Sequence, residues 1–306
     1  MSKEDLLKKK NVIIVYTGKK IVHGEETDVP ALRCGVTTKL PPEDLSKEDA
    51  IPALFDGLPT DVFQTPPINA LRGTKHRPAP GGVAISHSRV TGGTLGMLVR
   101  KNGVTYILSN NHVIANSNDA EMGDEIWQPA RACGGGSCDT IAHLSNFVPL
   151  RFKGRACRCA VVRFLFMKLA GPRLLSATIN KVDAAIARPL ISVDVTAEIL
   201  EIGKPAGFAS AAINEKIKKS GWTSGLTHGF VLGIDAVATV GYGGGKTATF
   251  EDQIVTTPMA SPGDSGSAGL DENSNVVGLL FAGSDSLTLF NKIDNVIEAL
   301  GLERNC

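Results

Sequence analysis

The sequence is poor in aromatic residues, has no excess of either charge and contains few cysteines for its length. Aromatic side chains make up 5% of the 306 residues, whereas 33 residues are glycine. Because glycine supplies the positive φ that tight turns need, this composition favours many short strands over a helical bundle. With 42% apolar residues the chain is long enough for two or three hydrophobic cores, so disorder is not expected.

The balance of charge excludes some classes of partner. Thirty-two basic residues against 31 acidic ones leave a formal net charge of +1. A chain with this net charge has no overall field that would attract nucleic acid or an anionic membrane. We therefore expect no nucleic-acid partner and no membrane partner.

Long apolar runs are missing near the start of the chain. The longest one there, Val12 to Tyr16, is too short for the core of a signal peptide or for a membrane span. We therefore expect a cytoplasmic protein. In a reducing compartment the six cysteines are expected to be thiols rather than disulfides.

The first 75 residues have the pattern of a small α/β domain. Apolar and β-branched runs predict strands over 11–18, 19–24, 29–39 and 58–65, and Ser46 is a candidate cap for a short helix. The segment 66–82 then combines proline, glycine and positive charge, which is typical of an exposed connector. We place the boundary near Lys75, giving domains of residues 1–75 and 76–306.

The remainder of the chain is predicted to be mainly β. The Asn102-Gly103 pair between two apolar runs is a strong signal for a hairpin. Later strand-like runs suit a sandwich or a pair of barrels; they cover 176–189, 195–203, 227–242, 247–257 and 275–283. Two helices are predicted as well: a surface helix of an insertion at 159–171, and a closing helix with Ile293, Val296, Ile297 and Leu300 at helical spacing.

The segment SPGDSGSAGL, residues 261–270, is the sharpest local signal. A nucleophilic serine needs a tight, exposed turn, and a developing oxyanion needs backbone N–H groups with no side chain in the way. Ser265, flanked by Gly263 and Gly266, fits both needs. The alternative is a glycine-serine turn without chemical function.

Two further residues fit the same chemistry. His112 follows an apolar strand that ends in small polar residues, and Asp183 stands inside the apolar run KVDAAIA. A buried carboxylate is costly unless a cation or donor meets it, and an imidazole N–H is a suitable partner. Alternatives are a structural histidine, a strand-end turn at Asp183, or its ion pair with Lys181 or Arg188. The order His, Asp, Ser is one of the few known for such a triad, and the joint coincidence favours the catalytic interpretation.

Through NNHVIA around His112, VDAAIA around Asp183 and GDSGSAG around Ser265, the sequence resembles the trypsin-like (chymotrypsin-fold) serine peptidases over residues 80–300. The resemblance implies two six-stranded antiparallel β-barrels with the triad in the cleft between them. It also implies that His112 is general base and then acid, that Asp183 orients it, and that Ser265 attacks. The N–H groups of Gly263 and Ser265 would form the oxyanion hole.

Other segments are similar to a bacterial branch of this family, namely KKSGWTSGLTHGFV, VVGLLFAGS and the NKIDNVIEAL helix. In that branch a short N-terminal α/β domain precedes the peptidase, and LPTDVF is similar to the final strand of that domain. The resemblance therefore implies a mainly β peptidase domain with a small N-terminal α/β domain and a C-terminal helix.

The resemblance also implies a specificity pocket. Met259 aligns with its floor, and Phe281, Ala282 and Gly283 align with its wall. Because a methionine floor offers no carboxylate to a basic side chain, we expect an apolar residue before the cut.

Asp264, next to Ser265, would need a cation. No activation peptide is evident, so pairing of this residue with a newly cut N-terminus is not assured. One hypothesis is that cleavage in the basic connector frees the peptidase.

No cofactor is expected for this chemistry. Cys133, Cys138, Cys157 and Cys159 could together hold a structural zinc ion, but their spacing is not a common zinc pattern and unligated thiols are the alternative. The stretches KKKNVIIV and GGGK lack the full spacing of a phosphate-binding loop.

These observations together predict a serine endopeptidase that acts on a protein or peptide substrate. Two alternatives use the same residues: a catalytically silent peptidase-like binding module, and an esterase with the same triad. The oligomeric state is left open. Regulation is expected, because uncontrolled proteolysis inside a cell is harmful.

Overall fold

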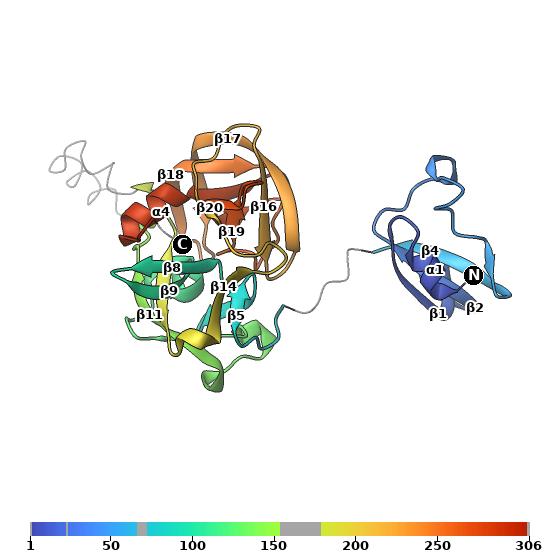
Figure 1. The fold of residues 1–306 in the computed structure, drawn as a ribbon, viewed down its shortest axis with the longest axis horizontal. Coiled ribbons are helices and arrows are strands. Elements are labelled where there is room, and N and C mark those ends of the chain that lie inside the picture. The colour runs from blue at the N-terminus through green and yellow to red at the C-terminus, as the bar shows by residue number, and fades with distance from the viewer. Residues whose placement is uncertain (1, 23, 66–71, 154–178, 305–306) are drawn as a thin grey trace, which may run out of the picture. The chain divides into compact units, whose positions relative to one another are not determined.

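The computed structural model describes residues 2–22, 24–65, 72–153 and 179–304 of the chain (Figure 1). The chain divides into two compact units, Met1–Ala70 and Leu71–Cys306. Arg72 falls in the predicted connector, yet its guanidinium is buried in the second unit and donates to the Ser220 hydroxyl at 2.5 Å. The second unit thus includes part of that connector. The division into domains at Lys75 stays a prediction.

In its described residues, the N-terminal unit is a four-stranded sheet with one short helix. Its strands lie in the order β1-β2-β4-β3, with β1 antiparallel and β4 parallel to β2. A buried cluster of Leu6, Leu32 and Cys34 joins the helix to β2. The elements are α1 (Lys3–Leu7), β1 (Val12–Val22), β2 (Glu25–Val36), a 3-10 turn (Pro42–Asp44), β3 (Leu54–Phe55) and β4 (Leu58–Gln64).

The helix predicted at Ser46 is not formed. The Ser46 hydroxyl accepts a hydrogen bond from the Asp49 N–H at 3.1 Å, and the Ala50 N–H donates to the Ser46 carbonyl, which closes a single turn. Ile51 precedes Pro52, and a residue before proline is disfavoured in helical geometry, so the turn does not continue. The helix of this unit is α1 instead, which the sequence analysis missed.

The first curled sheet of the second unit closes into a barrel. Its strand order is β7-β6-β10-β11-β13-β9-β8, and β7 and β8 form one chain segment interrupted by Leu95 and Gly96. Because β7 pairs with β6 while β8 pairs with β9, this segment joins the two ends of the order. The strands are β6 (Ala84–His87), β7 (Gly93–Thr94), β8 (Met97–Lys101), β9 (Val104–Ser109), β10 (Glu125–Trp127), β11 (Thr140–Phe147) and β13 (Ala185–Pro189).

The second curled sheet closes through its last strand, since β21 pairs with both β18 and β20. The ring runs β18-β17-β16-β19-β20-β21, and two-residue strands β12 and β15 add in parallel to β18 and β20. The strands are β12 (Ile179–Asn180), β15 (Gly207–Phe208), β16 (Lys216–Gly221), β17 (Gly225–Gly241), β18 (Thr247–Thr256), β19 (Ala268–Leu270), β20 (Asn275–Gly283) and β21 (Thr288–Lys292). The predicted mainly β, double six-stranded architecture is confirmed.

The hairpin turn and the C-terminal helix that were predicted from short sequence segments are both present in this unit. Asn102 and Gly103, at φ of 50° and 74°, form the predicted hairpin turn between β8 and β9. The C-terminal helix α4 (Ile293–Leu300) buries the four apolar residues predicted for it and ends at Gly301. A separate parallel pair, β5 (Ala79–Gly81) with β14 (Val195–Ile199), lies beside the barrels.

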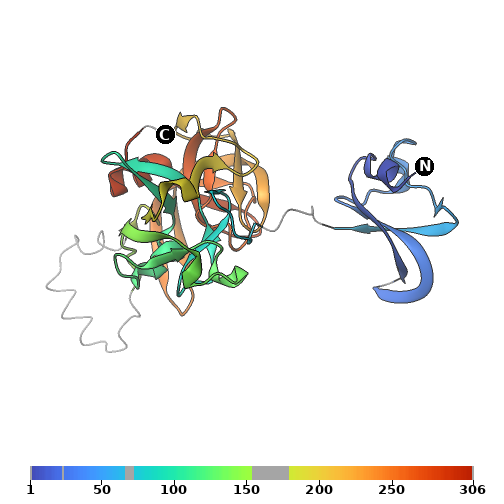
Figure 2. The same cartoon turned by 60° about the horizontal axis from the view of Figure 1, so that its bottom comes forward.

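The long β17–β18 hairpin extends from the second barrel to the first. Figure 2 shows its orange tip beside the green strands of the first barrel. At this tip Lys246 bonds to Asp119, and the Lys153 N–H donates to the Thr247 carbonyl at 2.7 Å. The hairpin therefore connects the two barrels along one side of the molecule.

Two predictions concern membranes and the insertion. No helix in the described ranges has the length and apolar character needed to cross a bilayer. The helix predicted at 159–171 lies outside the described residues.

Core packing in the first barrel gives a stability prediction. Ile126 is fully buried, so Ile126→Ala is expected to lower the free energy of unfolding by about 2–5 kcal/mol through lost burial and a residual cavity. Val237, whose side chain is 68% exposed, is the control, and Val237→Ala should change the free energy of unfolding by less than about 0.5 kcal/mol. The chain's two tryptophans, Trp127 and Trp222, both lie in the second unit, so urea unfolding followed by tryptophan fluorescence reports on that unit. Equal effects of the two substitutions would contradict this core assignment.

Candidate active site

His112 lies in a short helix at the end of a buried strand. After β9 the chain forms α2 (Asn111–Ile114), in which Asn111, Val113 and Ile114 are buried and hold the turn in place. The His112 side chain keeps 22% exposure. This placement leaves an anchored imidazole partly exposed to solvent.

Asp183 is fully buried and bonded to His112. The Asp183 carboxylate lies 2.6 Å from His112 Nδ1 and accepts the His112 backbone N–H at 3.2 Å. In the described part of the chain no lysine or arginine pairs with the Asp183 carboxylate, so the alternative ion pair with Lys181 or Arg188 is not formed. The Asn110 amide donates to the Asp183 carbonyl at 2.7 Å, which ties the two segments together.

Three further residues around Asp183 were missed in the sequence analysis. The Tyr242 hydroxyl donates to the Asp183 carboxylate at 2.8 Å. The Asn291 side chain accepts the Asp183 N–H at 2.9 Å and donates to Gln253 at 2.6 Å. No spacing in the sequence links these residues to Asp183, because they come from distant segments, the β17–β18 turn, β18 and β21, which the second barrel brings together.

Ser265 sits in a turn between β18 and β19 that only glycine allows. Gly263 and Gly266 have φ of 105° and 98°, in the left-handed region. A Cβ on Gly266 would come within 2.3 Å of the Ser109 hydroxyl oxygen and of the Thr94 carbonyl oxygen. The Thr94 N–H donates to the Ser265 carbonyl at 2.8 Å, which fixes the turn against the first barrel.

The Ser265 hydroxyl and two backbone N–H groups of this turn have few hydrogen-bond partners among the described residues. The Ser265 hydroxyl has one weak hydrogen bond, to the Phe281 carbonyl at 3.5 Å, and none to His112. Within the described residues, neither the Gly263 N–H nor the Ser265 N–H donates to a protein acceptor. Such N–H groups are available to a ligand oxygen.

Asp264 finds its cation inside the second unit. Lys219 and Asp264 are both fully buried, with Nζ 2.8 Å from the carboxylate. Burial acts to raise the pKa of Asp264, but the Lys219 charge and hydrogen bonds from Lys219, Ser224 and the Ser261 N–H hold it below its ordinary value. Burial lowers the pKa of Lys219, and the Asp264 charge opposes this only in part.

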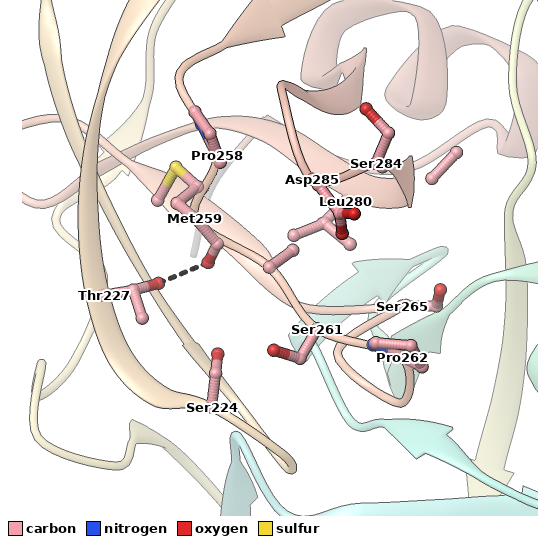
Figure 3. A pocket seen from close by; sticks show the side chains of 13 residues that line it. Ser224, Thr227, Pro258, Met259, Ser261, Pro262, Ser265, Leu280, Ser284 and Asp285 are labelled. Carbon is pink, nitrogen blue, oxygen red and sulfur yellow. Dashed lines mark hydrogen bonds between the residues drawn. The ribbon is translucent and has the colours of Figure 1, made fainter. Parts of the chain in front are cut away.

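A cavity of about 540 Å³ opens beside Ser265 (Figure 3). Met259 lines it and is 5% exposed, and Thr227 donates to the Met259 carbonyl at 2.7 Å. Of the other predicted wall residues, Ala282 and Gly283 also line it. Asp285, which the sequence analysis did not consider, lies in its lining as well.

Phe281 lies on the other side of Ser265. Its side chain packs on Phe250, with ring centroids 4.7 Å apart, and it lines a second cavity of about 660 Å³ rather than the first. His112, Tyr242 and Ser265 line this second cavity too. The two cavities meet at Ser265, so a groove extends to both sides of the serine.

The described residues hold no group of three or more potential metal ligands. Cys133 and Cys138 carry free thiols. Cys157 and Cys159 lie outside the described residues, so the zinc hypothesis stays untested.

Comparisons with known proteins find a similar sequence segment and no matching family model. No protein-family model matches the chain. Serine protease 2 of Streptomyces fradiae is 41% identical over 83 residues, which is 27% of this chain and 39% of that protein, so the chain matches well under half of this relative's length.

Similar solved structures are bacterial chymotrypsin-fold serine proteases. Cellulomonas bogoriensis chymotrypsin matches with a TM-score of 0.49 and 19% identity over 74% of this chain and 97% of that chain. Thermobifida fusca protease A matches with a TM-score of 0.49 and 18% identity, over 73% of this chain and 96% of that chain. The second unit of this chain, in which two curled sheets each close into a barrel, resembles the chymotrypsin-like double barrel.

Proposed function

We propose that the chain is a serine endopeptidase in which His112, Asp183 and Ser265 act as the catalytic triad. The observation that carries the proposal is the buried Asp183 carboxylate 2.6 Å from His112 Nδ1, with His112 and Ser265 lining one cavity. Serine protease 2 of Streptomyces fradiae, which one segment of the chain matches, is a serine protease by name. The substrate is a protein or peptide.

The proposed reaction follows from these groups. The Ser265 oxygen attacks the scissile carbonyl carbon while its proton passes to His112, and Asp183 faces the resulting imidazolium. The carbonyl oxygen becomes an oxyanion and accepts the free Gly263 and Ser265 N–H groups. Collapse breaks the peptide bond as His112 returns its proton to the leaving amine, and water then cleaves the acyl-enzyme in the same way.

The Lys219–Asp264 pair supports activity of the uncut chain. The Asp264 carboxylate accepts from the Thr223, Ser224 and Ser261 N–H groups, and so holds the turn that carries Ser265. Because its cation is an internal lysine, no newly cut terminus is required. Cleavage in the connector is therefore not part of the proposal.

The apolar preference before the cut is retained. The apolar part of the lining of the cavity beside Ser265 is Met259, Ala260, Leu280 and Ala282. Serine side chains line it too, and its Thr227 hydroxyl is already bonded to the Met259 carbonyl. An apolar side chain buried there gains about 25 cal/mol per Å². The Asp285 carboxylate is exposed, where water competes for a basic side chain.

A binding module is the second candidate function. It is favoured by one observation, that no hydrogen bond joins His112 and Ser265. Catalytic hydrogen bonds are often long in the absence of substrate, so this observation has less weight than the His112–Asp183 bond. An esterase would use the same residues, and relative rates on ester and peptide substrates separate it. The cytoplasmic location stays a prediction.

Reaction with a fluorophosphonate probe tests the triad. The intact chain is expected to be labelled, whereas Ser265→Ala removes the nucleophile and His112→Ala its base. Both should lower peptide hydrolysis by a factor on the order of 10⁴ or more. Ser192→Ala, at an exposed serine, is the control and should label like the parent. No labelling of the parent chain, before or after limited proteolysis, would favour the binding module.

The buried ion pair gives a second prediction. Lys219→Met leaves the Asp264 carboxylate buried without a cation, which is expected to cost about 3–5 kcal/mol of stability and to slow probe labelling. Lys218→Met, at the neighbouring lysine that bonds to Ser274, is the control and should change both much less. Since the pKa of Asp264 is lowered in the folded state, its stabilising contribution is present above the ordinary carboxyl pKa and lost as the pH falls through the folded value. Chemical unfolding at neutral pH and below pH 4 measures the free energy of unfolding of the parent chain and of both variants. Equal losses of stability in Lys219→Met and Lys218→Met would count against the role of the ion pair.

A peptide library that varies the residue before the cut tests specificity. We expect apolar residues to be cleaved fastest, and Asp285→Asn to leave that order unchanged. Preference for Lys or Arg that disappears in Asp285→Asn would assign specificity to this carboxylate instead of Met259.

A further inference from the structure

Tyr242 completes the set of donors on the Asp183 carboxylate. Three donors reach that carboxylate in the described part of the chain: the His112 ring at 2.6 Å, the His112 backbone N–H at 3.2 Å and the Tyr242 hydroxyl at 2.8 Å. The ring and the tyrosine share one oxygen, Oδ2. A fully buried carboxylate needs such donors, because burial without them is costly.

The chemistry of Tyr242 suits a permanent donor. Burial and the Asp183 charge raise the pKa of its phenol well above the ordinary value, so the hydroxyl keeps its proton. A hydrogen bond to the charged carboxylate is of the stronger kind. The Tyr242 hydroxyl is therefore a lasting donor to the carboxylate oxygen that also faces the His112 ring.

The position of Tyr242 is fixed by its neighbours. Its ring meets the His112 ring edge-on, at 5.7 Å between centroids, and the Phe152 ring in the same way at 5.3 Å. Its N–H donates to the Lys246 carbonyl at 2.9 Å, across the turn formed by Gly243–Gly245. These contacts hold the ring against His112 and the hydroxyl on Asp183.

Tyr242 also comes from a different barrel than its partners. It lies at the tip of the β17–β18 hairpin of the second barrel, whereas His112 and Asp183 are held by β9 and β13 of the first. From this geometry we propose that Tyr242 is a positioning residue, which fixes the Asp183–His112 pair from across the interface between the barrels. The inference rests on the proposed peptidase function and goes beyond it by adding a fourth side chain to the triad.

Tyr242→Phe isolates the hydroxyl, because phenylalanine keeps the ring that lines the second cavity. In peptide hydrolysis, kcat of this variant is expected to be about tenfold lower than that of the parent chain, with KM nearly unchanged. This is the size of effect expected from the loss of one hydrogen bond to a charged group. Tyr106→Phe is the matched control: its hydroxyl makes no hydrogen bond within the described residues, so both constants should hold. An unchanged kcat would overturn the proposal. A rise in KM alone would overturn it too, because that result indicates a contact between Tyr242 and the substrate.

A second arm does not depend on turnover. In the Ser265→Ala background, proton NMR records the resonance of the hydrogen between His112 Nδ1 and Asp183. Tyr242→Phe should move it downfield, because Oδ2 is then shared with no other donor, while Tyr106→Phe should leave it in place. An unmoved resonance refutes the positioning role. If the resonance moves in this background while the parent chain, with Ser265 intact, neither hydrolyses peptides nor reacts with the probe, the positioning role is kept and the peptidase function is rejected.

Discussion

The Asp183 carboxylate is fully buried, and the arrangement of the cleft depends on which hydrogen-bond donors surround this carboxylate. A carboxylate out of contact with water is unfavourable unless donors surround it. His112 supplies two donors and Tyr242 a third, while Asn110 and Asn291 hold the backbone of Asp183 itself. These groups come from both barrels, so the Asp183 carboxylate, which we propose orients His112, is also bonded to both halves of the proposed site.

The second buried charge has a parallel role on the serine side. Asp264 is surrounded by the Lys219 ammonium and by the N–H groups of Thr223, Ser224 and Ser261. A buried ion pair contributes little net stability compared with an apolar pair, but loss of one partner is costly. The pair therefore favours one conformation of the turn, in which the Gly263 and Ser265 N–H groups remain free.

Much of the fold could be predicted because its signals are local. Alternating apolar residues, the Asn102-Gly103 turn and the helical spacing of Ile293 to Leu300 each depend on neighbours along the chain, and the structure has all three. The helix at Ser46 failed because Pro52 stops it nearby. The candidate site residues were found through the types and order of His112, Asp183 and Ser265.

The sequence by itself determined the mainly β class, the closing helix and the glycine-flanked serine turn, because strand periodicity and positive φ are properties of short segments. Only the tertiary structure decided that Lys219 meets Asp264, that Tyr242 and Asn291 meet Asp183, and that Phe281 turns toward Phe250 rather than into the cavity with Met259. The bonded partners are between 45 and 108 residues apart in the chain. Closure of each barrel brings them together, and the requirement that buried charges and polar groups find partners selects which of them bond.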